Sequence, residues 1–156
     1  MASDVLIGLA VAALTVLAME GIAAAVHKYV MHGPGWAWHR SHHEPRDGRF
    51  ELNDLYALPF AAVSIALFAA GGWWWPLWWV GLGVAAYGVL YAFVHDGLVH
   101  RRFPFPKAPR RGYLKRLVQA HRMHHAVKGR TGAVSFGFLY APRIDRLKRQ
   151  LGDKAR

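Results

Sequence analysis

The ten histidines of this chain fall into four clusters with two recurring spacings. In chain order the spacings are HxxxxH, HxxHH, HxxxxH and HxxHH, so one pair of motifs occurs twice, with linkers of six and then twenty residues. Imidazole is the commonest metal ligand in proteins, and ten exceed the need of one four- to six-coordinate ion. The pattern indicates a site for two metal ions, with ten candidate ligands: His27, His32, His39, His42, His43, His95, His100, His121, His124 and His125.

The two spacings have different meanings on a helix. In HxxHH, positions i, i+3 and i+4 share one helix face, so three imidazoles can converge on one point. In HxxxxH, five residues at 100° each place the two side chains about 140° apart on a regular helix. Either the two histidines of such a pair serve different ions, or the helix breaks, as Gly33-Pro34 would permit after His32.

Other kinds of histidine site explain less of the pattern. A membrane cytochrome needs two axial histidines per haem and would leave several without a role. A metal-storage tract would be of low complexity, whereas these histidines are interleaved with Trp, Val and Leu. The chain has no cysteine, no HExxH and no Glu-x-x-His, which argues against thiolate-ligated clusters, typical zinc hydrolases and soluble di-iron bundles. Imidazole ligands alone do not identify the metal.

Three apolar stretches, at 5–26, 55–72 and 77–94, are long enough to cross a bilayer as helices. None of the 20 Lys and Arg residues precedes Lys28 or falls between positions 50 and 100. The first stretch is not expected to be a cleaved signal peptide, because Asp4 and no basic residue precedes it. The sequence therefore predicts an all-α integral membrane protein with three to four hydrophobic helices.

The basic residues also predict an orientation. They lie in the loop at 28–49 and from position 101 onward, which the positive-inside rule assigns to the cytoplasm. Each pair of histidine clusters follows a span, so we expect a histidine cap on the cytoplasmic side of the inner membrane. The charge of +11 then reflects topology, and nucleic-acid binding is not expected. The stretch 133–141 is too short to span and should pack on the protein or dip into the membrane interface. We expect one domain at 1–142 and a polar basic tail at 143–156.

Between the second and third spans lies a turn rich in tryptophan. Its residues fit an interfacial aromatic belt, although a surface that stacks on substrate is an alternative reading of them: Trp73, Trp74, Trp75, Trp78 and Trp79.

Four carboxylates are candidates to accept the second ring N–H of a metal-bound histidine, a contact that fixes its tautomer: Glu20, Glu44, Asp54 and Asp96. Glu20 lies inside the first span, where a carboxylate is costly and faces a polar interior, and it is expected within reach of His27. A helix-packing role for Glu20 and a helix-end role for Asp96 are the alternatives.

Longer blocks around the histidines resemble the bacterial β-carotene 3-hydroxylases, within the fatty-acid hydroxylase superfamily. The resemblance covers roughly residues 20–142, and all four histidine motifs are intact. The blocks that carry it are HKYVMHG (27–33), WHRSHHEPRDG (38–48), FELNDLYAL (50–58), YAFVHDGLVH (91–100), PRRGYLKRL (109–117) and AHRMHHAVKGRTGAVSFGFLYAP (120–142).

The resemblance implies a non-haem di-iron monooxygenase that uses O2 and two electrons from a ferredoxin and its reductase. It would hydroxylate C3 of the β-ionone rings of β-carotene, through β-cryptoxanthin to zeaxanthin. The chain has no GxGxxG fingerprint, so an external electron donor is required. Basic residues that could dock an acidic ferredoxin, or merely reflect topology, are Arg101, Arg102, Arg110, Arg111 and Lys115. A hydroxylase or desaturase of another lipid, and a non-catalytic membrane metal-binding protein, are the alternatives.

Overall fold

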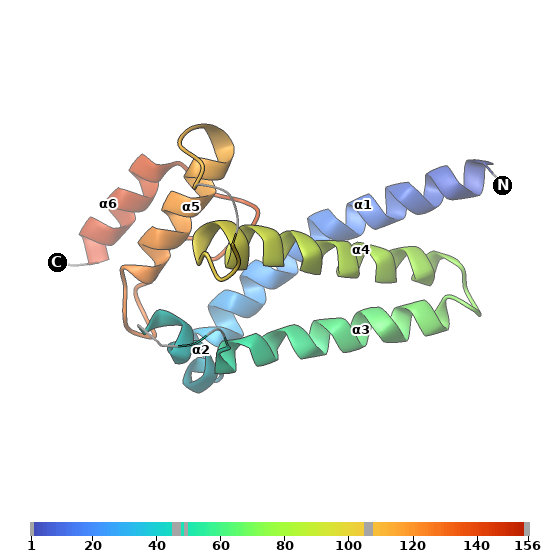
Figure 1. The fold of residues 1–156 in the computed structure, drawn as a ribbon, viewed down its shortest axis with the longest axis horizontal. Coiled ribbons are helices and arrows are strands. Elements are labelled where there is room, and N and C mark those ends of the chain that lie inside the picture. Colours follow the sequence, from blue (N-terminus) through green and yellow to red (C-terminus); the bar gives the residue numbers. More distant parts are fainter. Residues whose placement is uncertain (1, 45–47, 49, 105–107, 155–156) are drawn as a thin grey trace.

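The computed structural model describes residues 2–44, 48, 50–104 and 108–154, and every regular element in them is a helix (Figure 1). In chain order these elements are α1 (Ala2–Ala25), the π-helical turn η1 (Val26–Met31), α2 (Trp36–His43), the 3-10 turn η2 (Leu52–Tyr56), α3 (Ala57–Ala70), α4 (Pro76–Tyr91), the π-helical turn η3 (Ala92–Val99), α5 (Gly112–His125) and α6 (Ile144–Lys154).

Three helices in the described part of the chain are long and apolar enough to cross a membrane: Ala2–Met31, Leu52–Ala70 and Pro76–Val99. They confirm the three predicted spans. Two of them extend beyond the prediction at the histidine end, because α1 continues into η1 and α4 into η3 without interruption. Their apolar side chains are largely exposed, as expected for surfaces that contact lipid, and the chain is a membrane protein.

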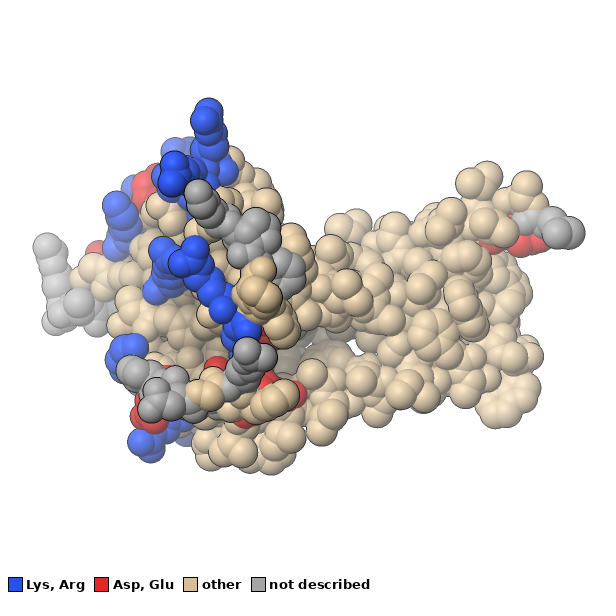
Figure 2. Space-filling view, in the orientation of Figure 1, with Lys and Arg blue, Asp and Glu red and all other residues tan. Residues whose placement is uncertain are grey.

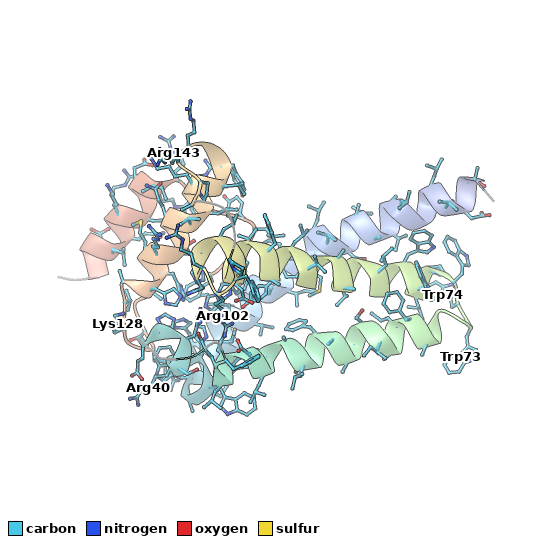
Figure 3. All side chains as sticks on the ribbon, in the orientation of Figure 1. Arg40, Trp73, Trp74, Arg102, Lys128 and Arg143 are labelled. Carbon is cyan, nitrogen blue, oxygen red and sulfur yellow. The ribbon has the colours of Figure 1, made fainter. Side chains whose placement is uncertain are left out.

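Charge divides the molecule along its long axis. Lys and Arg side chains gather at the end that carries α2, α5 and α6, whereas on this face the helices extending from it show neither, and acidic atoms stand at the far tip near the N-terminus (Figure 2). Arg40, Arg102, Lys128 and Arg143 lie at the basic end, and Trp73 lies at the opposite tip of the α3–α4 hairpin (Figure 3).

The tryptophans of this hairpin turn point outward. Trp73 is 92% exposed, and Trp74 is also exposed at the same tip, opposite the basic end. This position favours the interfacial belt over a surface that stacks substrate beside the histidines.

Small residues let α4 pack closely between α1 and α3. A Cβ at Gly83 would lie 2.7 Å from the Ala12 carbonyl of α1, so only glycine fits this contact. On the other side, the Ser64 hydroxyl donates to the Gly81 carbonyl over 2.9 Å, which satisfies a polar group inside the apolar pair. Close backbone approach through small residues is the usual way in which membrane helices associate.

The histidine end has its own apolar core. Val94, Leu117 and Ala120 are buried there with Val134, Ala141 and Leu147, which joins η3, α5, the segment 133–141 and α6. The stretch 133–141 thus packs on the protein, which was one of its two expected arrangements. The expected polar tail forms α6, whose Leu147 is buried in this core; residues 155–156 of that tail lie outside the described part.

Candidate metal centre

The HxxxxH pairs lie in the two π-helical turns. In η1 the His32 amide donates to the His27 carbonyl over 3.0 Å, and at η3 the His100 amide donates to the His95 carbonyl over 2.9 Å. A π turn bonds residue i+5 to residue i, so the second histidine stands one turn above the first instead of on the far side. The ring centroids are accordingly 5.3 Å and 4.6 Å apart. From the sequence, we expected either that the helix breaks within each HxxxxH pair or that the two histidines serve separate ions. Instead, a π turn brings the two histidines of each pair to the same side of the helix.

The ten imidazoles form two compact groups, each able to hold a metal ion. Site 1 consists of five histidines whose ligand atoms lie within 4.8 Å of one another: His27, His32, His39, His43 and His124. The same criterion groups four histidines of site 2: His42, His100, His121 and His125. His95 adjoins site 2, because its Nε2 lies 3.0 Å from Nε2 of His42. All ten predicted ligands are therefore in the centre, five beside each position.

Each HxxHH cluster divides between the two sites. His39 and His43, four residues apart on α2, face site 1, whereas His42 faces site 2. On α5 the roles are exchanged: His121 and His125 face site 2 and His124 faces site 1. The expectation that three imidazoles of one cluster meet at one point does not hold, because α2 and α5 lie on the same centre and each contributes to both sites.

Backbone carbonyls fix the tautomers of site 1. Nδ1 of His27 donates to the Phe136 carbonyl over 2.9 Å, and Nδ1 of His124 donates to the Val134 carbonyl over 3.0 Å. His32, His43 and His39 donate in the same way to the Arg130 carbonyl, the Val127 carbonyl and Asn53 Oδ1. A carbonyl only accepts, so Nδ1 carries the proton in these rings. All five Nε2 atoms of site 1 therefore present lone pairs to the middle of the group.

The distances between these nitrogens suit a shared cation. Nε2 of His39 lies 3.1 Å from Nε2 of His27 and 3.2 Å from Nε2 of His43. Two lone pairs facing each other cannot form a hydrogen bond, so the contact is favourable only around a positive ion. Two nitrogens at right angles, each about 2.1 Å from one ion, lie about 3.0 Å apart. The donor set thus fits a metal ligated by imidazole.

The electrostatic surroundings keep the imidazoles neutral. Burial lowers the pKa of His39 to about 3 and that of His43 to about 4. In site 2, burial lowers the pKa of His100 to about 4 and that of His125 to about 2. The charged form is disfavoured in each case because burial removes its hydration. At neutral pH these side chains are ready to ligate without first losing a proton.

Carboxylates support site 2. Nδ1 of His42 donates to Glu51 Oε2 over 2.8 Å, and Nδ1 of His95 donates to Asp96 Oδ1 over 2.8 Å. Arg102 ties these carboxylates together: it lies 3.3 Å from Asp96 Oδ1 and 3.7 Å from Glu51 Oε1, and it forms a two-pronged pair with Asp54 over 2.7 and 2.8 Å. Asp96 thus makes the contact with a histidine that was considered for it, and Asp54 is linked through Arg102 to the carboxylates on His42 and His95.

Two of the predicted supporting carboxylates lie elsewhere. Glu44 is half exposed and pairs with Arg40 at 2.7 Å on the surface of α2. Glu20 precedes His27 by seven residues, two turns or about 10.5 Å along a helix, which is too far for a direct hydrogen bond. The described partners of its carboxylate are the Tyr87 hydroxyl and three backbone amides at 138–140.

Sequence reasoning missed Glu51, Asn53 and the four carbonyls. Glu51 and Asn53 stand at the start of η2, where a capping box between Glu51 and Asp54 fixes the backbone. A polar E-x-N-D group directly before an apolar span was the available signal for the side chains. The carbonyls at 127–136 leave no signature in the sequence, because any residue provides one.

An apolar cavity of about 890 Å³ adjoins the centre between α1, α3 and α4. Its walls include Phe60 and Phe68 along the spans and, near the centre, Asn53, Asp96 and Phe138. Asn53 and Asp96 are bonded to histidines of different sites, and the Phe138 ring stacks on His27 at 4.9 Å. The cavity therefore extends from the membrane-spanning helices to residues that contact the histidines of both sites.

Several known proteins are similar to this chain in sequence. Residues 12–149 match the model of the fatty acid hydroxylase family. Beta-carotene hydroxylase from Pantoea ananas is 62% identical over 141 residues, covering 90% of this chain and 81% of that protein. Beta-carotene hydroxylase from Pseudescherichia vulneris is 66% identical over 129 residues, 82% of this chain and 73% of that one. The chloroplastic beta-carotene 3-hydroxylase of Haematococcus lacustris is 42% identical over 134 residues, 81% of this chain and 41% of that longer protein. No solved structure matches the chain.

Proposed function

Because the chain belongs to the fatty acid hydroxylase family, we propose that it is a membrane monooxygenase that hydroxylates C3 of the β-ionone rings of β-carotene. Acting at both ends, it would form β-cryptoxanthin and then zeaxanthin. The observation that carries the proposal is a ten-histidine centre that adjoins an apolar cavity in the membrane-spanning part. The identity to beta-carotene hydroxylases supports the substrate, and the name of the algal relative supports position 3.

The ten histidines would hold two iron ions, one in each site. When bound, such a pair supplies the activation of O2 that insertion into an unactivated C–H bond requires. The chain's own contribution is orientation: seven of the ten Nδ1 atoms donate to fixed carbonyl, amide or carboxylate oxygens, which aims each Nε2 into its site. Preorganised ligands of this kind hold a centre in one geometry through a reaction cycle.

The cavity would hold one end of the carotenoid. Its volume lies within the range of about 300–1,000 Å³ that is typical of small-molecule sites, and most of its wall is apolar. A β-ionone ring has no polar group, so position in the cavity must come from shape. Tyr91 stacks on His95 at 4.6 Å and packs edge-on against Phe138 at 4.8 Å, which forms an aromatic wall at the centre. That wall would set how far the ring advances and keep bulk water out.

The chain has no nucleotide-binding fingerprint of its own, which supports an external electron donor. A ferredoxin and its reductase, the donors that the resemblance implies, would take this role. The basic end of the molecule carries the histidine centre, so an acidic donor attracted there would lie close to the metals (Figure 2). We place this end in the cytoplasm and the spans in the inner membrane, on the distribution of Lys and Arg.

The proposal is tested by pigment chromatography from a bacterial host that accumulates β-carotene. Expression of the protein should give zeaxanthin through a mono-hydroxylated intermediate. His42→Ala and His124→Ala should abolish both products, because each removes an imidazole from a different site. Unchanged β-carotene beside confirmed membrane expression would refute the carotenoid substrate. Turnover of a fatty acid by the same membranes would then identify another lipid as the substrate.

A further inference from the structure

Glu20 is a carboxylate inside a membrane-spanning helix whose two oxygens accept four hydrogen bonds. The backbone amides of Phe138, Leu139 and Tyr140 each donate over 2.9 Å, and the Tyr87 hydroxyl donates over 2.9 Å from α4. An ionisable group at this depth is costly unless it is fully bonded. Glu20 therefore joins three parts of the molecule, namely α1, α4 and the segment 133–141.

The segment held by Glu20 is the one that orients part of site 1. The Phe136 carbonyl accepts from His27, and the Val134 carbonyl accepts from His124. The Phe138 ring stacks on the His27 ring at 4.9 Å with 15° between the planes. In the described residues of 133–141 there is no helix or strand to fix these carbonyls, and Ser135 has a positive φ of 58°. The bonds to Glu20 supply the order that regular structure would otherwise give.

Gly137 shows how closely the carboxylate and the segment fit. A Cβ at this position would lie 2.5 Å from Glu20 Oε1 and 2.8 Å from the Tyr140 carbonyl. The backbone can thus turn around the carboxylate only with glycine there. Glu20 and His27 also lie on one face of the helix, since seven residues are close to two whole turns. One continuous helix face therefore contacts the segment twice, once through each side chain.

From this arrangement we propose that Glu20 is a positioning residue for site 1. It clamps the segment 133–141 so that the Phe136 and Val134 carbonyls hold His27 and His124 in the ligating orientation. The inference rests on the proposed metal centre and assigns to one carboxylate the ordering of two of its ten imidazoles. Site 2 takes its hydrogen-bonding support from Glu51 and Asp96 and meets the segment through contacts of the Phe138 ring with His95 and His121, so the clamp should act mainly on site 1.

The test is cobalt(II) binding to the full chain in detergent, followed by visible absorption, with wild type, Glu20→Ala, Glu20→Gln and Tyr87→Phe. Wild type should bind two equivalents. Glu20→Ala should keep one tight equivalent and weaken the other by about 10- to 100-fold, the effect typical of losing a partner that orients ligands. Glu20→Gln retains one acceptor oxygen and should fall between the two. Tyr87→Phe removes the one described hydrogen bond to Glu20 that comes from outside the segment 133–141. This variant should therefore still bind both equivalents of cobalt.

Hydrogen exchange provides a second measurement that needs no variant. If the clamp and site 1 are coupled, removing metal from wild type must speed exchange at the amides of 138–140, since coupling is reciprocal. Equal exchange with and without metal would overturn the proposal, even if Glu20→Ala failed to fold. Two tight equivalents in Glu20→Ala, or equal weakening of both sites, would overturn it as well. A wild-type protein that binds no metal would instead refute the proposed function.

Discussion

Replacing Glu51 by Gln should weaken metal binding at site 2, whereas the same change at Glu44 should not. Both carboxylates follow the second histidine cluster in the sequence, although only Glu44 was expected to support it. The structure separates them: Glu51 is 13% exposed and accepts from His42 at 2.8 Å, whereas Glu44 is 49% exposed and pairs with Arg40. The two variants remove one charge each and keep the shape of the side chain, so each is the control for the other.

The size of the effect follows from what each carboxylate does. Loss of a group that orients a metal-bound histidine typically costs about 10- to 100-fold in metal affinity, or about 1.4–2.7 kcal/mol. Glutamine still offers a neutral oxygen to His42, and hydrogen bonds to charged groups are about twice as strong as neutral ones. Glu51→Gln should therefore lie near the tenfold end of that range. An exposed ion pair on a helix contributes about 0.3–0.5 kcal/mol, so Glu44→Gln should change affinity by less than about threefold.

The assay is competition between the protein in detergent and a cobalt(II) chelator of known affinity. Site 2 is identified by its loss in His42→Ala. If Glu51→Gln and Glu44→Gln bind with equal affinity, the carboxylate on His42 does not tune the metal, and the 2.8 Å contact between them has no effect on metal binding.

Three further outcomes are expected. Burial lowers the pKa of His39 to about 3 and that of His125 to about 2, from about 6.5 in the unfolded chain. Below pH 6.5 the unfolded state therefore binds more protons than the folded state, which destabilises the fold. The thermal unfolding midpoint in detergent should be constant above pH 6.5 and fall from pH 6.5 towards 4. A midpoint independent of pH would contradict this. Chelation of the metal should lower the midpoint at pH 7.5, because only the folded chain assembles both sites, and an unchanged midpoint would show that the histidines bind no ion. Gly88 lies in the cavity wall, where a Cβ would meet open space, so Gly88→Leu should reduce carotenoid turnover on the order of tenfold without changing the metal content. Gly21 also has open space for a Cβ but lies outside this cavity, so Gly21→Leu is the control and should leave turnover unchanged.

The elements of the fold were predictable because their signals are local. A run of about 20 apolar residues without charge specifies a membrane helix, and the Lys and Arg distribution marks the end that carries the histidines. The ten candidate ligands could be named for the same reason, since their residue type and their spacings are distinctive in the sequence. The partition into two sites was not, because it depends on how α2 and α5 approach each other, and that contact is long-range.

The π turns show where periodicity misleads. The expected angle of 140° between His27 and His32 assumes 100° per residue, as in an α-helix. The structure instead forms a π turn here, which places both side chains at the same site. The same π turn occurs at His95 and His100. Two candidate ligands spaced five residues apart do not share a face of an α-helix, so the repeat of this spacing in one chain is itself a signal for π turns. Such local departures from the regular pattern are expected at functional sites.

The surroundings of the two sites differ in charge, which predicts that they bind metal unequally. Beside site 2 stand Glu51, Asp54 and Asp96 with one compensating Arg102. Beside site 1, Lys128 and Arg130 donate to the carbonyls of His43 and His32 over 3.3 Å each.

Anions stabilise a metal cation and nearby cations oppose it, so site 2 should bind at least about tenfold more tightly. Cobalt(II) should then fill site 2 first, in two resolved phases. His42→Ala should remove the tight phase and His39→Ala the weak one. The reverse assignment, or a single phase with two equal sites, would show that the charges around the centre do not determine its order of filling.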